Sequence, residues 1–173
     1  MTDTIIKLLD QSFEEELFKF ELDNRSYFEE VGFPRADSYY DFNKFKTIIN
    51  ELIEEQEKGL IYMYLIIDDS GNIVGRINLL SIMRGPLNKA EIGYRVGEAH
   101  QSKGYGTTAV RLVLNEAMKK HKLHRVEAGT SPDNIGSQIV LIKNGFQFVG
   151  RYNKFIYQND KWHDSLIFEK ILD

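Results

Sequence analysis

Apolar side chains in the first 60 residues follow one strand pattern and then two helical patterns. Residues 5–9 are mostly apolar, and after them apolar side chains recur three or four positions apart, as on one face of a helix: Phe13, Leu17 and Phe20. Gly32-Phe33-Pro34 interrupts this spacing. A second helical face follows and ends near Gly59, with apolar residues at Phe45, Ile48, Ile49 and Leu52. We therefore expect a short strand followed by two helices.

Strand patterns dominate the rest of the chain. Apolar runs at 60–67 and 73–83 flank a polar turn at 68–72, which predicts a hairpin. Further strands are expected at 91–96 and 125–130, and helices at 134–144 and around Val110, Val113, Leu114 and Ala117. Residues 146–157 and 162–171 form a last hairpin across the turn 158–161. The pattern predicts one mixed α/β domain spanning residues 1–173, without linkers or repeats.

Composition limits the type of protein. The chain has 173 residues, of which 42% are hydrophobic, and this is enough to build one core. It has no apolar run long enough to span a membrane. Met1-Thr2-Asp3-Thr4 lacks the basic and apolar character of a signal region. We therefore expect a cytoplasmic protein without a membrane partner.

Cysteine content and charge exclude further classes. The chain has no cysteine, so disulfides, a cysteine nucleophile and thiolate metal sites are excluded. Its four histidines do not follow the spacing of a zinc enzyme, and we expect no metal. The formal net charge of −4 at pH 7 disfavours nucleic acid as a partner and is compatible with cationic amine substrates.

A glycine-rich segment, residues 101–106 (Gln-Ser-Lys-Gly-Tyr-Gly), joins the strand expected at 91–96 to the helix that follows. Because Gly104 and Gly106 have no side chain, several backbone N–H groups can turn toward one anion there. The positive end of the helix dipole adds to this attraction. The segment therefore predicts a binding site for a ligand that carries a pyrophosphate.

Two classes of ligand fit a pyrophosphate site. A dinucleotide is one, because Gly104, Gly106 and Ala109 match G-x-G-x-x-A and the acidic Glu127 follows at about the expected distance of roughly 20 residues. A dinucleotide fold, however, would place this motif in its first strand-helix turn and build a mostly parallel sheet around it. Here about 100 residues precede the turn. Coenzyme A is the second class and is favoured.

The glycine-rich segment, taken with its flanks, resembles the Q/R-x-x-G-x-G/A signature of the GNAT superfamily of acetyl-CoA-dependent N-acetyltransferases, with Gln101, Gly104 and Gly106 at the defining positions. Other motifs match in the family's order. They are Glu91-Ile92-Gly93-Tyr94, Asn134-Ile135-Gly136-Ser137, Lys143-Asn144-Gly145-Phe146 and Trp162-His163-Asp164-Ser165. The resemblance covers most of the chain from about Tyr62 onward, and it is strongest to the ribosomal-protein alanine acetyltransferase branch.

This resemblance implies a fold and a set of roles. The fold would be a central, largely antiparallel sheet of about seven strands with parallel strands four and five splayed apart, and four helices. A backbone N–H at Val96 or its neighbours would stabilise the oxyanion. Ser137 would protonate the leaving thiolate and Asn134 would bind the pantetheine arm. The implied cofactor-binding residues are Val96, Gln101, Ser102, Lys103, Gly104, Tyr105, Gly106, Thr107, Asn134 and Ser137.

The general base that must deprotonate the attacking amine is less clearly indicated. Glu91 starts the fourth strand, where many members of the superfamily carry a catalytic glutamate, and Asp164 lies in the last hairpin, which borders the acceptor site in relatives. Glu127 could face the substrate or pair with a nearby arginine. Ribosomal-protein alanine acetyltransferases carry a carboxylate on the sixth strand, where this chain has Ile156. We expect Glu91 and Asp164 to join Ser137 as catalytic residues.

The acceptor is not specified by a motif. Protein N-termini, polyamines, amino acids and aminoglycosides all stay open, and aromatic residues between the first two helices could either line the acceptor pocket or hold the loop to the core: Phe28, Phe33, Tyr39 and Tyr40. A non-catalytic acetyl-CoA-binding module and a nicotinamide oxidoreductase are the alternative functions. Exposed sheet edges also make a homodimer an open alternative.

Overall fold

Seven strands form one sheet in the computed structural model, which describes residues 4–32 and 34–173. The strand order is β1-β2-β3-β4-β5-β7-β6, and all neighbours pair antiparallel except β4 and β5, which are parallel. The strands are β1 (Ile5–Leu8), β2 (Tyr62–Ile67), β3 (Ile73–Met83), β4 (Lys89–Val96), β5 (Arg125–Thr130), β6 (Gln147–Gln158) and β7 (Lys161–Ile171). The expected sheet is confirmed.

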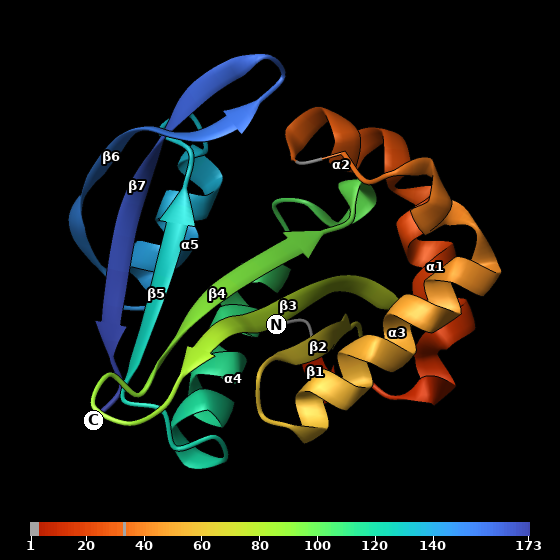
Figure 1. The fold of residues 1–173 in the computed structure, drawn as a ribbon, viewed down its shortest axis with the longest axis horizontal. Helices are drawn as coiled ribbons and strands as arrows, with labels where there is room; N and C mark the ends of the chain where they lie inside the picture. The colour runs from red at the N-terminus through yellow and green to blue at the C-terminus, as the bar shows by residue number, and fades with distance from the viewer. Residues whose placement is uncertain (1–3, 33) are drawn as a thin grey trace.

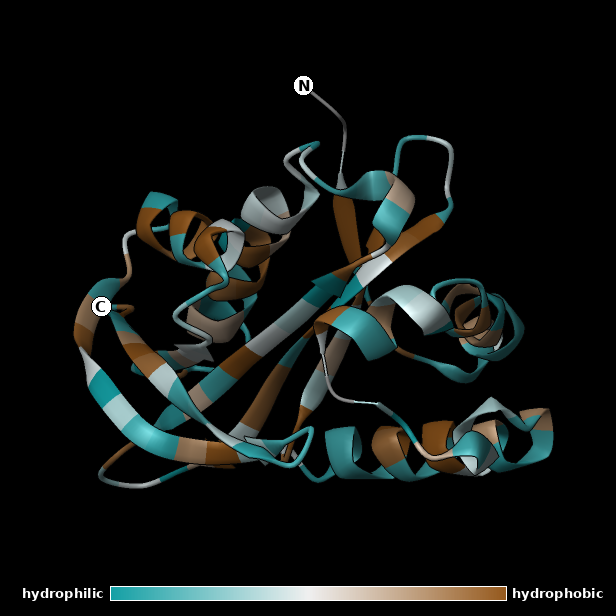
Figure 2. Ribbon diagram, turned by 90° about the horizontal axis from the view of Figure 1, so that it is seen from above, coloured by the Kyte–Doolittle hydropathy of each residue, from teal (hydrophilic) through white to brown (hydrophobic). Residues whose placement is uncertain are grey.

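Helices cover both faces of this sheet (Figure 1). They are α1 (Glu14–Asp23), α2 (Arg25–Val31), α3 (Phe42–Glu57), α4 (Tyr105–Lys119) and α5 (Ile135–Lys143). One apolar cluster packs the sheet against α4 and α5, and a second packs it against α1, α2 and α3. Figure 2 shows apolar segments along the strands, whereas the helices alternate between apolar and polar residues. This alternation is the helical pattern from which the sequence predicted them.

The described chain has five helices, so the prediction of four is wrong at one point. The first predicted helix is broken at Asn24 into α1 and α2. The Asn24 side-chain amide donates to the carbonyl of Phe20 at 2.9 Å and accepts from the backbone N–H of Glu98 at 3.0 Å. Asn24 thereby fastens the break to the segment after β4. Periodicity could not show this break, because Glu98 lies far along the chain.

Strands β4 and β5 diverge after a short paired region (Figure 1). Their parallel pairing joins Lys89–Glu91 to Arg125–Glu127, and the rest of β5 pairs only with β7. On its other side, β4 stays paired with β3 as far as Val96. A gap therefore opens in the sheet toward the carboxyl ends of β4 and β5.

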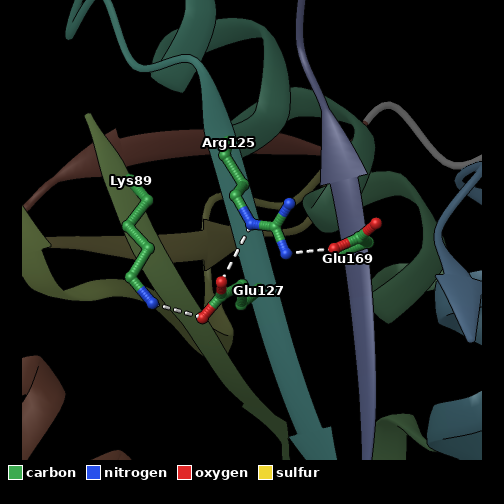
Figure 3. Close-up of polar contacts among 4 residues, drawn as sticks. All are labelled: Lys89, Arg125, Glu127 and Glu169. Atoms are coloured by element: carbon green, nitrogen blue, oxygen red, sulfur yellow. Dashed lines mark hydrogen bonds and ion pairs between the residues drawn. The ribbon is translucent and has the colours of Figure 1, made fainter. Parts of the chain in front are cut away.

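Side chains tie the three strands together at the paired end (Figure 3). Glu127 on β5 accepts from Lys89 on β4 at 2.6 Å and from Arg125 at 2.9 Å, and Arg125 also pairs with Glu169 on β7. Burial raises the pKa of Glu127, but the hydrogen bonds from Lys89 and Arg125 outweigh it, so that the pKa lies below its usual range. The pairing of Glu127 with a neighbouring arginine is confirmed, and it links the strands where β4 and β5 are still paired.

Candidate functional site

A cleft of about 770 Å³ lies where β4 ends and helices α4 and α5 begin. Every residue of the segment 101–107 except Lys103 lines it, as do the first turn of α5 and part of α2. The lining residues that bear on chemistry are Tyr94, Val96, Gln101, Ser102, Gly104, Tyr105, Gly106, Thr107, Asn134, Ser137 and Lys143. The structure therefore brings together the cofactor residues that the sequence predicted from two separate motifs.

The glycine-rich segment has the backbone conformation of an anion-binding turn. Gly104 has φ +86° at the N-cap of α4, and a Cβ added there would meet nothing within 4 Å. Gly104 is thus required by its left-handed backbone and not by a crowded neighbour. Gln101 donates from its amide to the carbonyl of Val96 at 2.6 Å, which fixes the segment to the end of β4. Lys103 turns its ammonium back onto the carbonyl of Ala99 at 2.8 Å, so its backbone is what the segment contributes.

The backbone N–H of Val96 points into the gap of the splay. The next residue, Gly97, donates its N–H to the carbonyl of Val74 on β3 at 2.8 Å. Because successive N–H groups along a strand point to opposite sides, the N–H of Val96 faces β5. Pairing between β4 and β5 has already ended at Glu91, and this N–H is free for a ligand atom.

Two hydroxyl groups, one on the first turn of α5 and one on β4, lie close together in the cleft. Asn134 caps the helix by accepting from the N–H of Ser137 at 3.0 Å. The Ser137 hydroxyl lies 3.0 Å from the hydroxyl of Tyr94 on β4. Burial raises the pKa of Tyr94, against a smaller lowering by Ser137, so the phenol stays protonated at neutral pH. Sequence reasoning missed Tyr94, although it lies in the strand-four motif and on the same strand face as Val96.

The motif Lys143-Asn144-Gly145-Phe146, at the end of α5, holds the two helices of the cleft together. Asn144 donates from its amide to the carbonyl of Thr107 on α4 at 3.1 Å and to that of Val140 at 2.9 Å. Gly145 follows Asn144, the C-cap residue of α5, and its φ of +78° is the left-handed conformation in which glycine commonly ends a helix. The motif around Asn144 therefore sets the distance between α5 and the glycine-rich segment.

A second cavity, of about 570 Å³, lies beyond the gap on the side of the sheet that α1 and α2 cover. Its walls come from the end of α2, from β3, β4 and β5, and from the β6–β7 hairpin. Gln158 at the hairpin tip donates to the carbonyl of Gly32 after α2, which connects the two walls. The two cavities share Tyr94, Arg95, Asn134 and Ser137, so they meet at the splay.

Charged groups lie beneath this second cavity. The Glu21 side chain is 0% exposed and lies 3.1 Å from Arg76, which is 5% exposed, and 3.6 Å from Arg95. The Arg76 guanidinium also donates to the Tyr39 hydroxyl at 3.4 Å. Burial and repulsion by Arg76 lower the pKa of Arg95 to about 10, despite the opposing attraction of Glu21. A carboxylate on the apolar face of a helix, at Glu21, is the signal by which the sequence could have indicated this cluster.

The predicted bases occupy different surroundings. Asp164 lines the second cavity, but it accepts from the backbone N–H of Lys154 at 2.7 Å and from Arg151, and both contacts lower its pKa. Glu91 is exposed, and it is not one of the residues that line either cavity. Ile156, at the position where relatives carry a carboxylate, lines the second cavity.

The aromatic residues of the α1–α3 region are divided between packing and the cofactor cleft. Phe28 lines the cleft and lies under the Arg95 guanidinium, 4.7 Å from ring centre to carbon. Tyr39 is buried and packs edge-on against Phe45. Phe33 lies outside the described residues. These aromatics therefore mainly hold the helices in place.

In residues 4–32 and 34–173, no group of three or more His, Asp or Glu side chains is arranged to hold a metal ion. None of the described helices has the length and apolar content that a membrane span requires.

Comparison with known proteins gives concordant results. The profile of the acetyltransferase (GNAT) domain family matches residues 13–147. A probable N-acetyltransferase, YjcK of Bacillus subtilis, is 40% identical over 154 residues, which cover 88% of this chain and 85% of that protein. The [ribosomal protein uS5]-alanine N-acetyltransferase of Escherichia coli is 25% identical over 120 residues, covering 69% of this chain and 61% of its own length.

Solved structures agree on the fold. The ribosomal-protein-S5-alanine acetyltransferase of Vibrio fischeri superposes with a TM-score of 0.92 at 25% identity, covering 98% of this chain and 93% of that one. RimJ of Mycobacterium smegmatis, solved in complex with CoA-disulfide, gives 0.88 at 23% identity, covering 97% and 81%. The single parallel strand pair also differs from the mostly parallel sheet of a dinucleotide fold. The chain belongs to the GNAT acetyltransferase family and is an acetyl-CoA-dependent N-acetyltransferase.

Proposed function

We propose that the acetyl group passes directly from acetyl-CoA to a primary amine at the splay between β4 and β5. The observation that carries this proposal is that the two cavities meet at Tyr94, Asn134 and Ser137. An amine arriving from one side can then face a thioester arriving from the other. The amine nitrogen forms a bond to the acetyl carbon, the carbon–sulfur bond breaks, and the amine proton leaves to a base or water.

The cofactor is held mainly by backbone groups in this proposal. The N–H groups of residues 102–107 receive the pyrophosphate, supported by the N-terminal end of α4. Asn134 and the strand edge at Val96 receive the pantetheine arm. The unpaired N–H of Val96 donates to the oxyanion as the tetrahedral intermediate forms.

Ser137 protonates the departing thiolate, and Tyr94 supports it. The phenol of Tyr94 stays protonated because burial raises its pKa, and its oxygen lies 3.0 Å from that of Ser137. In this proposal Tyr94 is the donor of the hydrogen bond between them. The serine hydroxyl is then free to give its own proton toward the sulfur. This role makes Tyr94 a positioning residue and Ser137 the catalytic acid.

A catalytic role of Glu91 and of Asp164 stays a prediction. Glu91→Gln and Asp164→Asn test it through the pH profile of kcat/KM. Loss of the general base lowers the rate by about 100-fold or more and removes the acidic limb of the profile. A carboxylate that serves only structure leaves that limb in place, and the ion pair of Asp164 with Arg151 is the observation that favours this result for Asp164.

The acceptor proposed from relatives is the N-terminal amine of a protein, with a small-molecule amine as the alternative. Residues 1–173 form a single acetyltransferase domain in this proposal, since the first and last strands belong to one sheet. A cytoplasmic location and a homodimer also stay predictions. For the dimer, the supporting observation is exposed apolar residues on α5 and the edge strand β6: Ile135, Ile139, Ile142, Phe148 and Val149. Sedimentation velocity measures its mass.

Turnover with purified protein tests the proposed function. Release of free coenzyme A is measured with acetyl-CoA and a panel of amines, and mass spectrometry identifies the acetylated nitrogen. Melting with acetyl-CoA, coenzyme A and NAD runs in parallel, and at about 100 times the dissociation constant binding adds about 2.7 kcal/mol. Binding of acetyl-CoA without turnover of any amine would favour the non-catalytic module, and stabilisation by NAD alone would favour an oxidoreductase.

A further inference from the structure

The second cavity is lined by more positive than negative charge. Arg35, Arg76 and Arg95 line it, and Asp164 is the carboxylate among its described lining residues. Asp164 is already paired with Arg151 outside the lining. Behind the wall, Glu21 is the carboxylate that contacts Arg76 and Arg95. The cavity therefore keeps an excess of guanidinium groups, although the whole chain has a net charge of −4.

Unpaired polar atoms gather at the same place. Among the described residues, the buried side-chain nitrogen and oxygen atoms without a hydrogen-bond partner belong to Glu21, Asn78 and Arg95. Asn78 and Arg95 line the second cavity, and Glu21 contacts Arg95. The Arg95 nitrogen and one Glu21 oxygen face each other at 3.6 Å, and the other Glu21 oxygen pairs with Arg76, so among these atoms only the Asn78 oxygen has neither a hydrogen bond nor an ion pair. A buried polar atom without a partner is costly, so this oxygen beside the cavity indicates a ligand that completes it.

The chemistry of these atoms specifies the missing groups. The Arg95 side chain is 23% exposed and keeps N–H donors besides those of the nitrogen that faces Glu21. A carboxylate is the acceptor whose geometry a guanidinium matches best. The unpaired Asn78 atom is a carbonyl oxygen, which accepts from an ammonium or amide N–H. The two residues lie on neighbouring strands and on the same face of the sheet, because Asn78 pairs with Gly93 and Arg76 with Arg95.

Resting on the proposed transfer to an amine, we infer that the acceptor carries a carboxylate close to its reacting amine, and that Arg95, with Arg76 and Arg35, selects for it. The carboxylate is supplied either by a free amino acid or by an acidic residue near the N-terminus of a peptide. A polyamine is the opposite kind of ligand, since it would bring more positive charge to three guanidinium groups. Arg95 lines both cavities, so its side chain borders the place where they meet.

Matched acceptor pairs test this inference. In the peptide arm, Ala-Asp-Ala-amide is compared with its isosteric partner Ala-Asn-Ala-amide; in the amino-acid arm, alanine is compared with alaninamide. Spermidine serves as the polycation. We expect kcat/KM for the carboxylate member of at least one pair to exceed that of its amide by about 10-fold or more, with spermidine the poorest acceptor. The arm that shows the preference identifies the source of the carboxylate.

Arg95→Gln shows whether the preference depends on this cavity. We expect it to lower kcat/KM for the carboxylate acceptor about 10-fold. The kcat/KM for the amide acceptor should stay within about twofold of the wild-type value, and the KM for acetyl-CoA should not change. Arg111→Gln is the matched control, because it removes the same charge from an exposed position on α4. If Arg95 had a purely structural role, its substitution would instead lower kcat/KM equally for both acceptors, and this result would overturn the inference.

Binding separates a failure of the inference from a failure of the proposed function. Calorimetry measures each acceptor in the presence of coenzyme A, where no transfer occurs. Equal use of carboxylate and amide members, or preference for spermidine, overturns the inference and leaves the acetyltransferase proposal standing. Carboxylate-selective binding without turnover of any acceptor supports the inference and overturns the catalytic proposal. Neither selective binding nor turnover overturns both.

Discussion

The cofactor cleft and the second cavity, where we propose that the acceptor binds and which we call the acceptor cavity, lie side by side at the splay, but they are built in different ways. The cleft uses backbone groups and small residues from one continuous segment, 101–107, together with the first turn of α5. The acceptor cavity uses long charged side chains from helix, strand and loop positions that are far apart in the chain: Glu21, Arg35, Arg76 and Arg95. Local sequence can encode the first kind of site, whereas only the assembled fold creates the second.

Gly104→Val gives the largest expected effect, because it tests whether the cleft depends on backbone conformation. A β-branched residue cannot adopt φ +86° without strain, so the N–H groups of the segment turn away from the pyrophosphate. Losing at least two hydrogen bonds to a charged ligand, at about 1.5–3 kcal/mol each, weakens acetyl-CoA binding by at least about 100-fold. Calorimetric titration measures the change.

Gly71→Val is the control for this substitution. Gly71 lies in the turn between β2 and β3, has the same φ of +86°, and an added Cβ there also meets nothing within 4 Å. Both variants should therefore lose similar stability, while only Gly104→Val loses binding. Equal binding losses in the two variants would mean that the effect is general destabilisation.

Glu21→Gln tests the other side of the comparison, where charge is buried. The substitution keeps the shape of the side chain but leaves Arg76 without its carboxylate in a buried position. We expect the free energy of unfolding to fall by about 3 kcal/mol, or the melting temperature by roughly 6–12 °C. Glu29→Gln, which removes a carboxylate from a surface ion pair with Arg25, should leave the melting temperature unchanged. Equal shifts of the melting temperature in the two variants would show that the buried carboxylate stabilises the fold no more than the surface one does.

Ser137→Ala acts where the two regions meet. Removing the hydroxyl takes away the proposed proton donor to the thiolate, so kcat should fall about 10- to 100-fold while the dissociation constant of acetyl-CoA changes less than about threefold. Tyr94→Phe, which removes only the supporting hydroxyl, should have a smaller effect of the same kind. Stopped-flow single turnovers and calorimetry separate the two quantities. An unchanged kcat in Ser137→Ala would assign the proton to water.

Lys103→Ala gives the smallest expected effect. Its ammonium donates back to the carbonyl of Ala99, just before the segment, and the substitution leaves the N–H of residue 103 in place. Acetyl-CoA affinity should therefore change less than about threefold, and by the same factor at low and high salt. A steep dependence on salt that disappears in the variant would show that the lysine contacts phosphate directly.

The sequence predicted features whose causes are local. Gly104 and Gly145 stand where the backbone needs a positive φ, and Asn134 stands at a helix N-cap, so each is recognisable from its neighbours. Strand β5 was predicted with its observed bounds, Arg125–Thr130, because its apolar pattern and flanking turns lie within a few residues. These features need no knowledge of tertiary structure.

Features that depend on distant partners could not be predicted. The helix break at Asn24 needs Glu98, and the buried charge of Glu21 needs Arg76 and Arg95 on two strands. The contact of Tyr94 with Ser137 joins β4 to α5. Periodicity identifies which face of an element is buried, but it does not identify the residue on the opposite element.

The presence of a second cavity beside the cofactor cleft has a consequence for steady-state kinetics. Because the two cavities share part of their lining but each also has walls of its own, the proposed reaction allows both substrates to be present together before either product leaves. Double-reciprocal plots against one substrate at fixed levels of the other should therefore intersect, not run parallel. A dead-end analogue of the amine should likewise fail to displace coenzyme A from the protein.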